Sequence, residues 1–364
     1  MVSIVGCGLT KLDRYYELSE KDLVSEAYKQ LITKIKEYDQ PDIVIVSSGY
    51  IDVLGKNILS SYKISSGLGL QNTKVMRIEN GDNGGASIFT AYSFIKSGVA
   101  KKVLLIGIEK FSDYPSKYVN EYLSYNLDND YTYHVGITPH AYSALLMKKY
   151  MKKYNVDYEY FTKWPIKMHQ NASENPLAYL KFKVDKNTVV NSQIVSDPLR
   201  IFDVGARADG ASVVLVTADE VAKRYFDSPV KIDGIVGNIG AMNLSDPSLP
   251  SVAKARNELG DLPKRDVVYE IHDSYSIMAA LEIEELKLAE RGKGLDVVDS
   301  LDINLSGGLK ARGYIGGGTA IYQLGEVFLH LTNQFKGKSA NAEKGIILSN
   351  DDLGNTSYLA VLSR

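Results

Sequence analysis

The sequence has a single cysteine, Cys7, among its 364 residues. One thiol excludes an internal disulfide and a zinc site built from several cysteines. No apolar run reaches the roughly 18 residues of a membrane-spanning helix, so we expect no membrane span. The N-terminal Met-Val-Ser-Ile-Val-Gly has neither the basic region nor the long apolar region of a signal peptide. We therefore expect a cytoplasmic protein.

Charge of one sign is also not in excess. Lysine and arginine together number 42 and aspartate and glutamate 44, which leaves a net charge of −2. A balance of this kind gives no electrostatic basis for binding nucleic acid. The hydrophobic content of 45% and the charged content of 24% are those of an ordinary globular protein. At this length we expect two domains or two halves.

Short apolar runs alternate with helical periodicity along the chain. We expect strands at 2–6, 43–46, 103–107, 211–216, 230–237, 267–271, 345–348 and 358–362. We expect helices at 19–38, 160–175, 251–260 and 319–334, the first of them capped by Ser19 and the second limited by Pro176. Continuous β-branched strands are typical of a parallel sheet covered on both faces. The pattern therefore predicts a layered α/β fold.

The second half repeats the order of the first. A Gly-rich turn, a helix and an apolar strand occur at 80–107 and again at 306–348. We interpret this as a divergent duplication, with an N-terminal half at 1–225 and a C-terminal half at 226–364. The stretch from about 113 to 200 holds nearly half of the tyrosines, many lysines and Trp164. It predicts an insertion of helices and loops that shapes a pocket.

The central motif runs from Arg77 to Gly98 and predicts a short strand, a Gly-rich turn and a helix. Asp82 stands where this helix begins. Unpaired backbone N–H groups and the helix dipole favour a nucleophile or an anion there. Aspartate is also one of the best N-cap residues, so local evidence favours a capping role over a functional one.

Two further loops lie at comparable points of the repeated units. His272 directly follows the strand at 267–271, where an imidazole can act as hydrogen-bond donor or base. The loop at 304–314 offers backbone N–H groups at its glycines and a phenol at Tyr314. Ligands bind beyond the carboxyl ends of parallel strands, so these loops and Asp82 are expected to converge. Local backbone bonding of His272 and turn packing of Tyr314 remain alternatives.

Taken together, four motifs resemble the thiolase superfamily, in particular its sterol-carrier-protein type and the similar archaeal proteins. They are E-N-G-D-N-G-G-A at 79–86, D-V-G-A-R-A-D-G-A-S at 203–212, I-H-D-S-Y-S at 271–276 and N-L-S-G-G-L-K-A-R-G-Y at 304–314. The resemblance spans 2–362. It implies two βαβαβαββ halves in α-β-α-β-α layers, a homodimer, and a CoA thioester as substrate or ligand without a further cofactor or metal.

The chain departs from the family pattern where the chemistry occurs. Asp82 stands at the nucleophilic cysteine, Tyr314 at the histidine of the family's Gly-His-Pro motif, and 349–354 covers the region of the second cysteine, whereas His272 is retained. A carboxylate at 82 would have to form a mixed anhydride, a far poorer intermediate than a thioester. The resemblance therefore implies a site without ping-pong acyl transfer. Its catalytic positions are Asp82, His272 and Tyr314, and its substrate-binding positions are Asn304, Ser306, Gly307, Gly308, Gly313 and Gly354.

Three functions stay open at this point. The first is retro-aldol cleavage of a 3-hydroxyacyl-CoA, as in thiolase-like aldolases that use tyrosines. The second is a non-catalytic scaffold beside a small zinc-ribbon and OB-fold partner that binds acyl-CoA. The third is acetyl-CoA acetyltransfer by unrecognised groups. Turnover of a hydroxyacyl-CoA without free CoA separates the first from the others.

Overall fold

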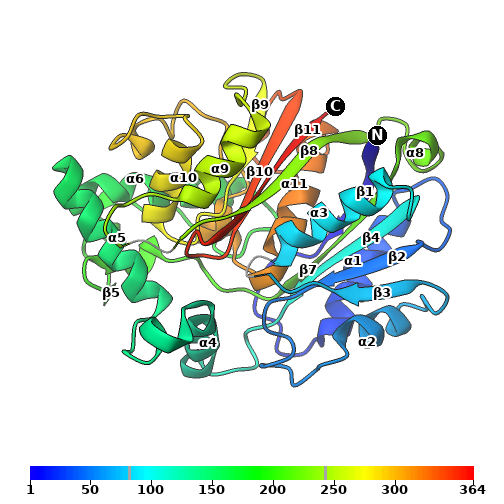
Figure 1. Cartoon of the computed structure of the whole chain (residues 1–364), viewed down its shortest axis with the longest axis horizontal. Helices are drawn as coiled ribbons and strands as arrows, with labels where there is room; N and C mark the ends of the chain where they lie inside the picture. The colour runs from blue at the N-terminus through cyan, green and yellow to red at the C-terminus, as the bar shows by residue number, and fades with distance from the viewer. Residues whose placement is uncertain (81–82, 242–243) are drawn as a thin grey trace.

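The computed structural model describes residues 1–80, 83–241 and 244–364. Its centre is a nine-stranded sheet in the order β3-β2-β4-β7-β1-β8-β11-β10-β9 (Figure 1). The strands are β1 (Val2–Leu9), β2 (Ile43–Ser47), β3 (Lys74–Arg77), β4 (Lys102–Glu109), β7 (Gly210–Ala218), β8 (Val230–Ile239), β9 (Val267–Glu270), β10 (Lys344–Asn350) and β11 (Thr356–Ser363). The alternating pattern of the sequence thus forms the predicted α/β fold.

The sheet consists of two similar halves. The first half has the strand order β3-β2-β4-β7-β1. The second half has the order β8-β11-β10-β9, which is the order of the first half in reverse, without a described strand that corresponds to β3. In the first half, β2 and β4 are parallel, and β4 and β7 are antiparallel. In the second half, β9 and β10 are parallel, and β10 and β11 are antiparallel. In the described part of the second half, a single bridge between Tyr269 and Ile303 occupies the position of β3. A short ladder between Val2–Ile4 of β1 and Val230–Ile232 of β8 joins the halves.

Helices form three layers around the two halves of the sheet. They are α1 (Glu20–Ile32), α2 (Ser60–Gly67), α3 (Asn83–Lys96), α8 (Asp219–Tyr225), α9 (Pro250–Leu259), α10 (Ser276–Glu285) and α11 (Thr319–Leu331). The middle layer is α3 and α11, which contact each other and strands of both halves (Figure 1). The outer layers are α1, α2 and α8 on the first half and α9 and α10 on the second. This is the predicted α-β-α-β-α arrangement.

The first helix shows how tertiary contacts override periodicity. Ser19 and Asp22 form the expected capping box, in which Asp22 accepts from the Ser19 backbone N–H at 2.9 Å. The helix ends at Ile32, however, and not near Tyr38 as predicted. The N–H of Lys36 instead donates to the carbonyl of Tyr225 at 2.9 Å. The chain turns away to pair with α8, and a contact from another part of the chain thereby ends the helix.

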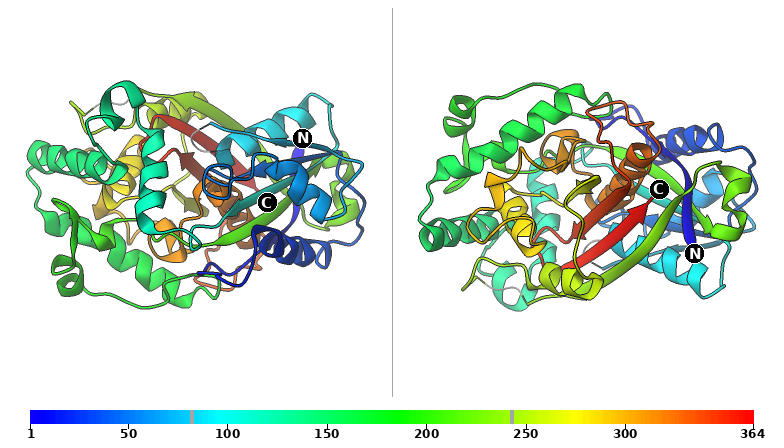
Figure 2. Two further views of the ribbon diagram at one scale, coloured as in Figure 1. Left: turned by 90° about the horizontal axis from the view of Figure 1, so that it is seen from below. Right: turned by 90° about the horizontal axis from the view of Figure 1, so that it is seen from above.

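The insertion between β4 and β7 is more ordered than its composition suggests. It contains α4 (Ser116–Leu123), α5 (Pro139–Tyr154), α6 (Lys163–Glu174), α7 (Lys186–Val190) and a hairpin of β5 (Ile194–Ser196) and β6 (Leu199–Arg200). Although the insertion belongs to the first half in sequence, its helices α5 and α6 contact α10 of the second half (Figure 2). Helix α6 ends at Glu174, as Pro176 predicts. Among the described helices, none combines the length and the apolar character needed to cross a membrane.

Candidate active site

His272 and Tyr314 meet at one carboxylate, that of Asp352. The Nε2 atom of His272 lies 2.8 Å from Oδ1 of Asp352, and the Tyr314 hydroxyl donates to Oδ2 at 2.7 Å. The two rings are perpendicular, with centroids 6.1 Å apart. His272 follows β9 by two residues, and Asp352 follows β10 by two. The carboxyl ends of neighbouring parallel strands therefore bring these groups together, as the loop positions predict.

Tyr314 is held rigidly by its backbone and its ring. Its N–H donates to the carbonyl of Ala206 at 2.8 Å, and its carbonyl accepts from Ala208 at 3.0 Å. The ring stacks on Phe111 at 6.1 Å between centroids and 12° between planes. Burial, and then the charge of Asp352, raise the pKa of the phenol well above its usual value. Tyr314 is therefore a protonated hydrogen-bond donor at neutral pH.

Asp352 lies in a strained turn that buried side chains hold in place. Its φ is +67°, a conformation that non-glycine residues seldom adopt, and its N–H donates to the Asn350 side chain at 3.0 Å. Asn350 in turn donates to the Glu282 carboxyl of α10. Glu282 is completely buried, and burial raises its pKa to about 8, so it is largely neutral at pH 7. A neutral support of this kind places Asp352 without adding a second negative charge.

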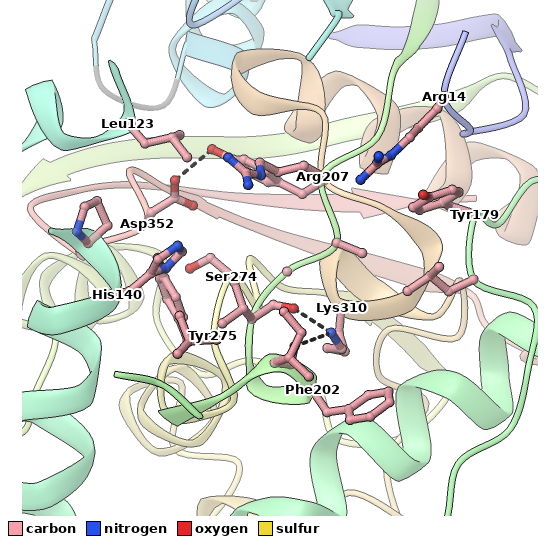
Figure 3. Close-up of a pocket in the computed structure, with 18 of the residues that line it drawn as sticks. Arg14, Leu123, His140, Tyr179, Phe202, Arg207, Ser274, Tyr275, Lys310 and Asp352 are labelled. Carbon is pink, nitrogen blue, oxygen red and sulfur yellow. Dashed lines mark hydrogen bonds between the residues drawn. The ribbon is translucent and has the colours of Figure 1, made fainter. Parts of the chain in front are cut away.

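A cavity of about 370 Å³ opens beside Tyr314 and Asp352 (Figure 3). Its polar lining comprises Arg14, His140, Tyr179, Arg207, Ser274, Tyr275, Lys310, Tyr314 and Asp352. Apolar residues of the insertion, such as Phe182 and Val195, form another part of the wall. The insertion thus shapes the pocket, as its composition predicts.

A second pair of polar groups, His140 and Tyr275, lies on the α5 side of this cavity. The Nδ1 atom of His140 lies 2.9 Å from the Tyr275 hydroxyl. Burial, followed by the nearby charge of Arg207, lowers the pKa of His140 to about 4, so its imidazole is neutral at pH 7. Burial raises the pKa of Tyr275 well above its usual value. Both groups therefore offer uncharged hydrogen bonds to a ligand.

The loop that follows Asp302 is organised by Asp273, the neighbour of His272. Its carboxylate accepts from the Leu309 N–H at 2.8 Å, the Trp164 indole at 2.9 Å and the Asn304 amide at 2.7 Å. Burial raises the pKa of Asp273 to about 6. Trp164 belongs to the insertion, so one carboxylate ties α6, the loop and the His272 turn together.

The six predicted substrate-binding residues make contacts within the protein. Asn304 accepts from the Ile271 N–H at 2.7 Å, and Ser306 donates to Glu270 at 2.9 Å. The four glycines all have positive φ. A Cβ added to any of them would lie against protein atoms: those of Ala172 for Gly307, Asp273 for Gly308, Leu12 and Ala208 for Gly313, and Leu249 for Gly354. None of the six belongs to the described residues that line the cavity. Their assignment to a substrate stays a prediction.

Asp82 lies outside the described residues, so its predicted role stays a prediction too. Helix α3 begins directly after it at Asn83, in agreement with the strand, turn and helix expected there. The Asn83 side chain donates to the Ser48 carbonyl at 2.6 Å and accepts from the Asn80 N–H at 2.9 Å. These bonds tie the start of the helix to the carboxyl end of β2.

Sequence reasoning missed three groups of this site. Asp352 lies in the segment 349–354 that we compared with the second cysteine, and its position just after a buried strand was the available signal. Arg207 lies inside the quoted motif 203–212 without having been singled out. His140 carried no sequence signal, because its contact with Tyr275 spans 135 residues. Within the described ranges, no cluster of three or more His, Cys, Asp or Glu side chains has the geometry of a metal site.

Comparisons with known proteins identify the family of the chain. The family model "Thiolase, N-terminal domain" matches residues 2–219, and "Thiolase C-terminal domain-like" matches residues 247–364. Acetyl-CoA acetyltransferase of Methanothermobacter thermautotrophicus is 28% identical over 382 residues, covering 100% of this chain and 99% of the relative. Sterol carrier protein 2 of Gallus gallus is 26% identical, covering 94% of this chain and 67% of the relative.

Among solved structures, that of an "Ltp2-ChsH2(DUF35) aldolase" superposes with a TM-score of 0.83. The superposition covers 100% of this chain and 97% of the aldolase chain, with 16% sequence identity. The two chains therefore share a fold. Together the two family models cover most of this chain. The chain belongs to the thiolase family.

Proposed function

We propose that this protein binds a CoA thioester in the cavity beside Tyr314 and Asp352 and does not carry out covalent thiolase chemistry. The observation that carries the proposal is the Asp352 carboxylate, which bonds both Tyr314 and His272. By resemblance, Asp82 stands where thiolases have their nucleophilic cysteine. A carboxylate there is a poor acyl carrier. The remaining machinery suits proton transfer more than acyl transfer.

The reaction that fits these groups is retro-aldol cleavage of a 3-hydroxyacyl-CoA. The proton of the 3-hydroxyl passes to Tyr314 while Tyr314 passes its own to Asp352. The C2–C3 electron pair moves into the thioester as the bond breaks, which releases a ketone or aldehyde. The resemblance assigns His272 to the thioester oxygen, where the enolate charge develops. The proton then returns from Asp352 through Tyr314 to C2 of the enolate, which restores both side chains and releases a shorter acyl-CoA.

The experiment is incubation of the purified protein with a 3-hydroxyacyl-CoA without free CoA, followed by mass spectrometry of the products. We expect a shorter acyl-CoA and a carbonyl compound, and we expect Tyr314→Phe to lose this cleavage while still binding the substrate. Tyr269→Phe is the matched control, because it removes another buried phenol whose hydroxyl bonds the Pro263 carbonyl. Cleavage that requires free CoA would refute the retro-aldol reaction in favour of thiolysis.

A second candidate function is that of a scaffold subunit, and it has one observation in its favour. The aldolase with the same fold is named as a pair, Ltp2 with ChsH2(DUF35). We propose a comparable small zinc-ribbon and OB-fold partner for this chain, together with a homodimer. Substrate binding without cleavage, both alone and with a co-purified partner, would support the scaffold and refute the aldolase. Analytical ultracentrifugation would test the dimer.

A further inference from the structure

The cavity contains an arginine that forms no ion pair with a carboxylate in the described part of the chain. Ion pairs with a carboxylate are formed by Arg77, Arg224, Arg256, Arg291 and Arg312. Arg207 forms none with any acid in the ranges 1–80, 83–241 and 244–364, and its guanidinium donates to the neutral Asn120 side chain at 2.8 Å. Burial lowers the pKa of this guanidinium, because removing the charged group from water is unfavourable. Arg207 is therefore charged, half-buried and short of an anion.

The other charges of the cavity already have partners. Lys310 donates its ammonium to the carbonyls of Val204 at 2.6 Å and Ile201 at 3.2 Å. Asp352 accepts from Tyr314 and lies within hydrogen-bond distance of His272. Arg14, which lies at the same cavity and hydrogen-bonds Tyr16 and Tyr179, adds a third cation (Figure 3). The lining thus has an excess of positive charge, with the guanidinium of Arg207 available for an incoming anion.

The backbone around Arg207 is fixed on both sides. Asp203 accepts from the Tyr158 hydroxyl at 2.8 Å, and Asp209 accepts from the Phe111 N–H at 2.7 Å. Between these anchors, residue 207 forms a parallel bridge with Tyr314. A side chain positioned in this way loses little further freedom when it binds a ligand. Arg207 therefore has the features of a prepared binding group.

The position of Arg207 also identifies which part of a CoA thioester it meets. It is paired through the backbone with Tyr314, at the reacting end of the cavity. In a CoA thioester, the long pantetheine arm separates the phosphates from the thioester carbon. When the reacting carbons are at Tyr314, the phosphates are far away and the nearby anion must belong to the acyl group. A guanidinium fork binds a carboxylate through two parallel hydrogen bonds.

We propose that the acyl group of the substrate ends in a carboxylate and that Arg207 binds it. This inference rests on the proposed binding of a CoA thioester and adds its substrate class, a dicarboxylic acid monothioester. Asn120 of α4 would hold the guanidinium in orientation, because it already accepts one of its N–H groups. Arg207 is thus a specificity-determining residue in addition to the groups that perform the chemistry.

The test compares glutaryl-CoA with valeryl-CoA, which have acyl chains of the same length with and without the terminal carboxylate. Calorimetric titration of the full-length protein gives a dissociation constant for each. A hydrogen-bonded charge pair predicts that glutaryl-CoA binds about 10- to 100-fold more tightly. Arg207→Met should abolish this ratio and leave valeryl-CoA binding unchanged, while Arg207→Lys should retain part of it. Arg224→Met on the exposed outer helix α8 is the matched control.

Each outcome of these titrations supports or overturns the proposed carboxylate subsite at Arg207. Equal affinity of the wild-type protein for the two thioesters overturns the carboxylate subsite while the proposed CoA-thioester binding stands. A loss in Arg207→Met that is the same for glutaryl-CoA, valeryl-CoA and free CoA also overturns it, because Arg207 then contacts the CoA moiety. Absence of binding by either thioester refutes the proposed function and this inference together. If Arg207→Met does not fold, the wild-type ratio alone still supports or refutes the subsite.

Discussion

Replacing Glu282 by glutamine should change how stability depends on pH. Glu282 lies on α10 with its side chain completely buried, and one carboxyl oxygen accepts from Asn350. Burial raises its pKa from 4.5 to about 8. The folded protein therefore keeps the proton over a pH range in which the unfolded chain has released it. Glutamine has nearly the same shape as the protonated glutamic acid and can still accept from Asn350.

The magnitude follows from this pKa difference. As pH rises from about 4.5 to about 8, only the unfolded chain loses the proton at this position, so the free energy of unfolding falls. The full difference corresponds to about 5 kcal/mol. The glutamine variant lacks this decline. Relative to wild type, Glu282→Gln should therefore become progressively more stable between pH 5 and pH 9.

Urea unfolding followed by the fluorescence of Trp164, the single tryptophan, measures the effect. Comparing variant and wild type at each pH cancels the contributions of other buried carboxyls such as Glu109, whose pKa burial raises to about 7. Glu343→Gln, at an exposed glutamate before β10, is the matched control. If the difference between Glu282→Gln and wild type is the same at pH 5 and pH 9, the reasoning about this carboxyl is wrong.

Three further predictions concern buried groups. Arg312→Met removes the cation paired with Glu326 in the core and should lower the free energy of unfolding by about 3–5 kcal/mol in urea; a loss below about 1 kcal/mol would contradict this. Gly308→Ala places a Cβ 2.4 Å from an Asp273 oxygen, at a residue whose φ is +59°. Calorimetry should therefore show destabilisation of more than about 1 kcal/mol. An unchanged melting temperature would contradict this prediction. Burial raises the pKa of the Cys7 thiol to about 12, so a disulfide reagent should label it in urea and not in the native protein; rapid native labelling would oppose the structure.

The fold was predictable because its patterns are local. Strands β2 and β4 are largely apolar, and all of their residues except Lys102 are buried, as expected of parallel strands covered on both faces. Helix α11 is buried on every side, because it lies in the middle layer between the two halves. The repeated order of turn, helix and strand then indicated the duplication. The early end of α1 could not be predicted, because it depends on a bond from Lys36 to Tyr225.

The site was predictable only at its strand ends. His272 and Tyr314 could be proposed because each follows or closes a recognisable motif. The role of Asp352 could not, because it depends on a strained turn and on bonds to residues 80 and 38 positions away. The charge of Arg207 is visible in the sequence, but that no described carboxylate pairs with it is a property of the folded chain. Chemistry that depends on such distant contacts requires the structure.

The most direct test of the central claim is calorimetric titration of the full-length protein with acetyl-CoA, beside a variant that fills the cavity. Ala206 lines the cavity and its backbone bonds Tyr314 and Leu309, so Ala206→Trp blocks the space without removing a polar group. We predict saturable binding to the wild-type protein and none to Ala206→Trp, with thermal unfolding showing that the variant is folded. Absence of binding to the wild type, or undiminished binding to the folded variant, would contradict the assignment of this cavity to a CoA thioester.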